Sequence, residues 1–163
     1  LENSPVVFLN GPRQAGKSTL VQKLSQGDYP AEYVSFDSAS QMAAATASPE
    51  AFLKQRKGSL IIDEVQMVPE LFRSLKEVVD ELRLTDKSAS NGRFLLTGSA
   101  NIMALPKLSD ALVGRMSVKT LYPLAGCEVL SGKGDFLNQL FACDFPAVKN
   151  KASLNEVIRA ATF

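Results

Sequence analysis

The chain has 163 residues, which is close to the usual size of one domain. Its 18 Lys and Arg residues balance 17 Asp and Glu residues, so net charge does not indicate a polyanionic partner, and nucleic-acid binding would need a local basic patch. No apolar run approaches the roughly 20 residues of a membrane-spanning helix, and neither an initiator Met nor a signal peptide opens the sequence. We therefore expect a cytoplasmic domain without membrane association, taken from a longer protein.

The cysteine and histidine content excludes several kinds of site. There is no His, and the two cysteines, Cys127 and Cys143, are too far apart for a CxxC motif. Zinc sites built from Cys and His, and catalysis by His, are thereby excluded, so general-base chemistry falls to a carboxylate. We expect both thiols to serve packing, because disulfides are rare inside cells.

In chain order, short apolar strands alternate with helices. Residues 6–9 form an all-apolar run typical of a strand buried on both faces, and residues 18–26 follow as a helix. Apolar side chains along residues 69–83 recur on one face of a helix. Further strands are predicted at residues 33–36, 59–63, 93–97 and 116–121, and a helical stretch at 38–56 that restarts at Ser48-Pro49. The alternation predicts an α/β domain with a mostly parallel central sheet.

The pattern weakens beyond Pro123, where residues 136–141 and 154–161 look helical but have no strand partner. We expect residues 1–125 to form the α/β core and residues 126–163 to form a helical extension.

Residues 11–18, Gly-Pro-Arg-Gln-Ala-Gly-Lys-Ser, match the phosphate-binding loop pattern GxxxxGK[ST] without a departure. The two glycines allow a backbone path that turns N–H groups toward a phosphate, and the next helix directs its N-terminus at the same anion. Lys17 is expected to reach the β- and γ-phosphates, Ser18 to bind magnesium and Thr19 to contact the α-phosphate. The alternative is a turn with a surface lysine. The predicted nucleotide-binding residues are Gly11, Pro12, Arg13, Gln14, Ala15, Gly16, Lys17, Ser18 and Thr19.

A pair of carboxylates follows the strand at residues 59–63. Asp63 ends that buried strand, where a phosphate loop needs a second magnesium ligand, and Glu64 follows as a candidate general base. Strand ends also often expose acids to solvent, so the pair gains its meaning from the phosphate loop.

Two further candidates come later in the chain. The segment Thr97-Gly98-Ser99-Ala100-Asn101 ends a strand, and Thr97 or Ser99 could contact the γ-phosphate or the attacking water; the alternative is a polar cap for the next helix. Arg115, after Gly114, could neutralise charge on the transferred phosphoryl group or form a surface salt bridge.

Other phosphate-loop enzymes fit less well. A GTPase should carry NKxD and DxxG motifs, whereas Asp63 is followed by Glu-Val-Gln and residues 150–153 lack the Asp. A small-molecule kinase usually has an arginine-rich lid, but the arginines are dispersed. The adjacent Asp and Glu indicate the AAA-like branch, a three-layer P-loop NTPase fold with an extra strand between the strands of the phosphate loop and of Asp63. That strand would be residues 93–97, which places Thr97 and Ser99 near the γ-phosphate.

Taken together, these motifs resemble prokaryotic AAA-type ATPases that carry a C-terminal domain of unknown function. The resemblance covers residues 5–130 and rests on GPRQAGKSTL, IDEVQ, LLTGS, LVGR and YPL followed by Glu128. It implies ATP with Mg²⁺, a role for Arg115 and a polar role for Gln66 near the carboxylates. Ser18 stands where the family more often has Thr, and the chain ends at Phe163, where the second domain should begin, so we expect that domain to be truncated.

Three functions remain open at this stage. The first is ATP hydrolysis by a water that Glu64 activates. The second is a nucleotide-controlled switch with negligible turnover that acts on a partner or on the missing C-terminal domain. The third is a DNA-associated motor or loader, against which the balanced charge argues mildly. A homo-oligomer would be required if Arg115 acts in trans.

Overall fold

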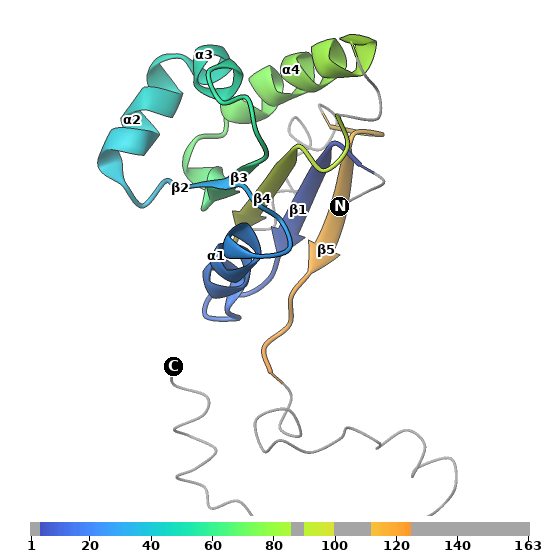
Figure 1. The fold of residues 1–163 in the computed structure, drawn as a ribbon. Coiled ribbons are helices and arrows are strands. Elements are labelled where there is room, and N and C mark those ends of the chain that lie inside the picture. Colours follow the sequence, from blue (N-terminus) through green and yellow to red (C-terminus); the bar gives the residue numbers. More distant parts are fainter. Residues whose placement is uncertain (1–3, 86–89, 100–111, 125–163) are drawn as a thin grey trace, which may run out of the picture. The chain divides into compact units, whose positions relative to one another are not determined.

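Five short strands form a single sheet in the computed structural model, which describes residues 4–85, 90–99 and 112–124 (Figure 1). The strand order is β2-β3-β4-β1-β5, and every pairing is parallel. β4 thus lies between β1 and β3, as the sequence predicted. The strands are β1 (Val6–Asn10), β2 (Glu32–Ser35), β3 (Leu60–Asp63), β4 (Phe94–Gly98) and β5 (Met116–Thr120).

Helices lie on both faces of this sheet (Figure 1). The first helix after the phosphate loop packs on one face, and the next three pack on the other. A 3₁₀ turn that the sequence did not predict follows β3. The helices are α1 (Lys17–Gln26), α2 (Ala39–Ala47), α3 (Pro49–Lys54), η1 (Val65–Met67) and α4 (Leu71–Thr85). This arrangement confirms the three-layer α/β fold.

The core divides at the sheet because alternate strand residues point to opposite faces. Phe8, Ile62 and Leu96 point toward α2, α3 and α4, whereas Val7, Ile61 and Leu95 pack on α1 around Val21. The apolar stripe predicted for residues 69–83 is confirmed on α4, whose buried residues are Leu71, Phe72, Leu75, Val78 and Val79. Each such side chain contributes about 1.5–3 kcal/mol through burial.

The parallel arrangement gives the sheet two unlike edges. All five strands end at one edge, here called the carboxyl edge, at Ser35, Asp63, Gly98, Asn10 and Thr120. They begin at the amino edge, at Glu32, Leu60, Phe94, Val6 and Met116. In open parallel sheets, ligands bind outside the carboxyl ends of the strands.

Contacts between residues divide the chain into a unit of residues 1–122 and a unit of residues 123–163. Almost all of the second unit lies outside the described residues, as do Ala100, Asn101, both cysteines, Glu128 and the two helices expected at 136–141 and 154–161. None of the helices in the described ranges has the length and apolar character to cross a bilayer.

Candidate nucleotide site at the carboxyl edge

The phosphate loop connects the end of β1 to the start of α1. Gly16, the N-cap of α1, is left-handed at φ 86° and has no side chain that could cap the helix. Gln14 is also left-handed, at φ 64°. Gly11 lies so close to β5 that a side chain there would overlap the Leu121 carbonyl oxygen. The loop therefore has the tight path and the open helix N-terminus that a phosphate requires.

Lys17 is folded over this loop. The residue is only 5% exposed, and its Nζ donates to the carbonyl oxygens of Gly11 at 3.0 Å and Pro12 at 2.8 Å. These bonds use two of the three N–H groups of the ammonium. Its charge is consequently held at the mouth of the loop, where an anion would compete with the two carbonyl oxygens. Ser18 is half-buried, and Arg13 and Thr19 are exposed.

Asp63 is the most enclosed acid of the site, at 2% exposure. Thr97 on β4 donates its hydroxyl to Oδ1, and Tyr33 on β2 donates its hydroxyl to Oδ2 at 2.7 Å. Burial, followed by this bond to the carboxylate, raises the pKa of Tyr33 to about 12, so the phenol remains a donor at neutral pH. No Lys or Arg in the described ranges forms an ion pair with Asp63.

This environment fits a divalent cation. A buried carboxylate without a cationic partner is costly, and the bonds from Thr97 and Tyr33 occupy two of its roughly four acceptor positions. Among the described residues, no group of three or more acidic, Cys or His side chains could enclose a metal. The donor set suits Mg²⁺, which typically takes one or two protein carboxylates and completes its shell with water and phosphate oxygens.

Glu64 begins the short turn after β3. Its backbone is left-handed at φ 57°, a conformation that costs a residue other than Gly about 1–3 kcal/mol. Its N–H lies 3.4 Å from the Thr97 hydroxyl oxygen, and its carboxylate accepts a hydrogen bond from Gln66. The same Gln66 amide nitrogen lies 3.4 Å from the Ser99 hydroxyl.

The sheet brings the loop and the carboxylates to the same edge. Asn10 of β1 pairs with Gly98 of β4, and Ile62 of β3 pairs with Leu96 of β4, so only β4 separates the loop from Asp63. Since neighbouring strands are about 4.8 Å apart, β1 and β3 are separated by roughly 10 Å. Thr97 lies on this middle strand, and Ser99 directly follows it.

Arg115 lies elsewhere. It precedes β5, and β5 starts beside Val6, so Arg115 is at the amino edge. Its guanidinium forms a paired contact with Asp80 on α4, Nε to Oδ1 at 2.5 Å and Nη2 to Oδ2 at 3.0 Å. This contact lowers the pKa of Asp80 and raises that of Arg115. Within one copy of the chain, the structure does not bring Arg115 to the phosphate loop.

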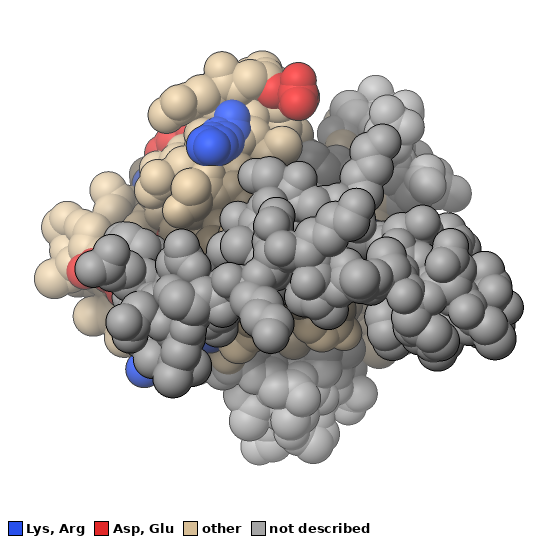
Figure 2. Space-filling view, turned by 90° about the horizontal axis from the view of Figure 1, so that it is seen from below, with Lys and Arg blue, Asp and Glu red and all other residues tan. Residues whose placement is uncertain are grey.

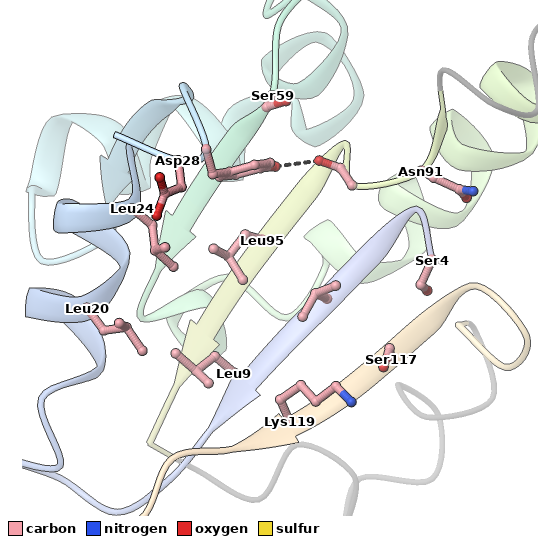
Figure 3. A pocket seen from close by; sticks show the side chains of 13 residues that line it. Ser4, Leu9, Leu20, Leu24, Asp28, Ser59, Asn91, Leu95, Ser117 and Lys119 are labelled. Atoms are coloured by element: carbon pink, nitrogen blue, oxygen red, sulfur yellow. Dashed lines mark hydrogen bonds between the residues drawn. The ribbon is translucent and has the colours of Figure 1, made fainter. Parts of the chain in front are cut away.

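A groove of about 800 Å³ on the α1 face of the sheet is separate from this site (Figure 3). Leu20 and Leu24 of α1 form one side, Ser117 and Lys119 of β5 form the other, and strand residues such as Leu9 form the floor. None of residues 11–19 is among its described lining residues. The groove is the part of this face that α1 does not cover.

Charged side chains form no continuous patch in the view of Figure 2. Among the described residues that this view leaves uncovered, blue and red groups are scattered singly.

Two contacts of the site were not predicted from the sequence. Tyr33 of β2 lies opposite Ile61 of β3. Ile61 is two residues before Asp63, so the side chains of Tyr33 and Asp63 are on the same face of the sheet, and this spacing could have identified Tyr33 as a partner of Asp63. The bond from Gln66 to Ser99 joins residues 33 positions apart and has no local signal.

Comparison with known proteins gives relatives of much greater length. The uncharacterized proteins Mb2031c of Mycobacterium bovis and Rv2008c of Mycobacterium tuberculosis are each 35% identical to this chain over 138 residues. That alignment covers 84% of this chain but 29% of each relative, so the chain spans less than a third of their length.

Solved structures align with the chain at low identity. Domain III of the Thermotoga maritima replication initiation protein DnaA aligns over 98% of this chain and 84% of its own, with 17% identity and a TM-score of 0.45. A structure of two Pif1 helicases at forked double-stranded DNA aligns over 97% of this chain and 47% of its own, with 15% identity and a TM-score of 0.47. A family model described as an AAA domain matches residues 3–130.

Proposed function

Because the chain belongs to the AAA domain family, we propose that it binds ATP at the phosphate loop and hydrolyses it at the carboxyl edge. The observation that carries the proposal is the arrangement of this edge. A phosphate loop with a buried lysine lies on one side of β4, and on the other side lies a buried carboxylate that has no cationic partner among the described residues.

The loop would bind the triphosphate through its backbone. The N–H groups of residues 13–16 and of the first turn of α1 would donate to the phosphate oxygens. Lys17 would exchange its bonds to the Gly11 and Pro12 carbonyl oxygens for the β- and γ-phosphates. Thr19 would contact the α-phosphate, and the exposed Arg13 would contribute a donor from the loop itself.

Ser18 and Asp63 would hold Mg²⁺, Ser18 through its hydroxyl and Asp63 through the acceptor positions that Tyr33 and Thr97 leave free. When bound, the ion would neutralise charge that develops on the phosphate oxygens. Tyr33 and Thr97 would fix the orientation of the carboxylate, as partners of metal ligands generally do.

Glu64 would act as the general base. The water oxygen forms a bond to the γ-phosphorus, the bond from that phosphorus to the bridging oxygen breaks, and Glu64 takes the proton of the water. Ser99 would donate to the γ-phosphate, and Thr97 would support Asp63 and the Glu64 N–H. The products are ADP and inorganic phosphate.

A catalytic role for Arg115 requires a second copy of the chain, because Arg115 lies at the amino edge of its own sheet. We therefore propose that it acts on the phosphate of a neighbouring subunit, after leaving Asp80. Mixing two variants tests this proposal. Lys17→Ala has a defective phosphate loop but keeps Arg115, whereas Arg115→Met keeps the loop but lacks the arginine. Phosphate release that recovers on mixing two inactive variants would support action in trans. An Arg115→Met variant with full activity would contradict any catalytic role.

The proposed hydrolysis is tested by phosphate release from the full-length protein with ATP and Mg²⁺. We expect Lys17→Ala and Glu64→Gln each to lower the rate at least about 100-fold. Glu70→Gln, which neutralises an exposed carboxylate nearby, is the matched control and should leave the rate unchanged. Equal rates for the wild type, Lys17→Ala and Glu64→Gln would refute the proposal.

A further inference from the structure

Gln66 connects the two strand ends that carry the proposed base and sensor. Its amide nitrogen donates to Glu64 Oε2 after β3 and lies 3.4 Å from Ser99 Oγ after β4. The two N–H groups of one amide are thereby shared between a carboxylate and a hydroxyl. Few side chains can donate to both at once from one atom.

The chemistry of the neighbours fixes the orientation of this amide. A carboxylate only accepts hydrogen bonds, so the nitrogen of Gln66 must face Glu64. Its Oε1 is then buried without a partner among the described residues. This orphaned acceptor is unfavourable, so the two bonds from the nitrogen must hold the side chain in place.

Gly98 provides the space for this arrangement. A Cβ at position 98 would lie 2.7 Å from Gln66 Oε1 and 3.2 Å from the Phe8 ring. The backbone below Gln66 is also fixed, because Val65 is fully buried and the Met67 N–H donates to the Glu64 carbonyl oxygen at 3.0 Å. These contacts fix the backbone of the turn, and the two contacts of the amide nitrogen hold the Gln66 side chain.

The donors and acceptors of Ser99, Gln66 and Glu64 are ordered so that they can form a continuous series of hydrogen bonds. A serine hydroxyl can donate one hydrogen bond while it accepts others. Ser99 can thus donate to a γ-phosphate oxygen and still accept from Gln66, whose second N–H donates to Glu64. The chain would run from the phosphate to the carboxylate that activates water.

We propose that Gln66 is a positioning residue that transmits the presence of the γ-phosphate from Ser99 to Glu64. This inference depends on the proposed ATP hydrolysis and specifies how the base is held. With ADP, Ser99 has no γ-phosphate to contact, and Gln66 holds Glu64 without that anchor. With ATP, the full chain fixes the carboxylate against the attacking water.

The kinetic test uses Gln66→Met, which keeps the length of the side chain but removes the amide. In the full-length protein we expect single-turnover phosphate release to fall about tenfold, a fraction of what a well-placed general base contributes. The dissociation constant for ATP should change less than about twofold, because the loop binds the phosphates. Gln55→Met, an exposed glutamine at the end of α3, is the control and should match the wild type.

A double-mutant cycle distinguishes this role from a merely structural one. If Ser99 acts through Gln66, Ser99→Ala combined with Gln66→Met should be no slower than the slower single variant. A double variant whose rate loss is the product of the two single losses would overturn the proposed path from Ser99 through Gln66 to Glu64. Gly98→Ala, which displaces Gln66 Oε1, should slow phosphate release as much as Gln66→Met does. If Gln66→Met unfolds early in a thermal melt, Gln66→Glu replaces it, because glutamate has the same length but lacks the N–H donors, and it should show the same loss.

A readout independent of activity is the NMR signal of the Gln66 side-chain amide, identified by its absence in Gln66→Met. We expect it to shift on Ser99→Ala and to differ between ADP and a non-hydrolysable ATP analogue. An amide signal that is the same with both nucleotides would overturn the proposal. So would Glu64-dependent hydrolysis that Gln66→Met leaves at the wild-type rate. Absence of any Glu64-dependent hydrolysis would instead refute the proposed function, and the role of Gln66 with it.

Discussion

The two edges of the same sheet differ in how they treat polar groups. At the amino edge, Arg115 and Asp80 satisfy each other in a half-exposed ion pair. At the carboxyl edge, the buried Asp63 has two hydroxyl partners but no described cation, Glu64 is left-handed, and Gln66 has an orphaned oxygen. Groups that remain unsatisfied in the folded chain mark places where a ligand completes the structure.

The contrast has one exception. Arg93, just before β4, is at the amino edge, where burial lowers its pKa and its Nη1 has no partner among the described residues. Its Nη2 donates to the Arg56 carbonyl oxygen, and its guanidinium lies 5.0 Å from the Phe94 ring centre. Arg93 is half-buried, and these contacts hold it at the amino edge, away from the phosphate loop.

The largest effect is expected from Gly11→Ala. The new methyl group would overlap the Leu121 carbonyl oxygen, so the loop must move from β5. Overpacking of this kind costs about 1–3 kcal/mol, and we expect ATP binding, measured by calorimetry, to weaken at least about 100-fold. Gly58→Ala is the control, since nothing lies within 4 Å of a Cβ at that position. Wild-type affinity in Gly11→Ala would show that the close contact with β5 does not shape the loop.

A smaller effect is expected from Thr97→Val, which keeps the shape but removes the hydroxyl that donates to Asp63. Loss of a buried hydrogen bond to a charged group should lower the free energy of unfolding by about 1.5–3 kcal/mol, measured in urea. Thr97→Ser keeps the hydroxyl and should lose less. A valine variant as stable as the serine variant would mean that Asp63 does not need this donor.

Tyr33→Phe removes the other donor to Asp63, from a half-buried position, and should cost about 1 kcal/mol. The loss should be the same at neutral pH and at about pH 9, because the phenol is protonated at both and the bond is lost only as the pH rises through its raised pKa of about 12. A phenylalanine variant as stable as the wild type at both pH values would mean that the phenol does not stabilise Asp63.

The smallest effect is expected at the amino edge. Asp80→Asn should lower the free energy of unfolding by less than about 1 kcal/mol, since the ion pair is partly exposed. Arg115 lowers the pKa of Asp80, so the contribution is present above the ordinary value of 3.8 and is lost as the pH falls through the lowered pKa. Urea unfolding at neutral and acidic pH measures this, and a loss larger than that of Thr97→Val would reverse the comparison of the two edges.

The sequence predicted the sheet well because each strand carries its own signal. Apolar runs that end in polar residues identified β1, β3 and β4, and the adjacent Asp63 and Glu64 predicted where β4 would lie. Helix α4 was predicted with its buried face because its apolar spacing is local.

What the sequence did not predict depends on contacts between distant elements. The spacing of the motifs did not decide whether Arg115 has a catalytic role or forms a salt bridge. The position of β5 in the structure shows that Asp80 is its partner. The partners of Asp63 likewise depend on the register of β2 and β4. The role of each loop and edge residue in catalysis stays a prediction.

The central claim is that the carboxyl edge cleaves ATP rather than only binding it. The most direct test is a single turnover, with the full-length protein in excess over ATP and Mg²⁺ present. We predict that the wild type converts bound ATP to ADP and phosphate, whereas Glu64→Gln binds ATP with similar affinity but cleaves it at least about 100-fold more slowly. Tight binding by both proteins, with no cleavage faster in the wild type than in Glu64→Gln, would contradict the account and indicate a nucleotide-controlled switch.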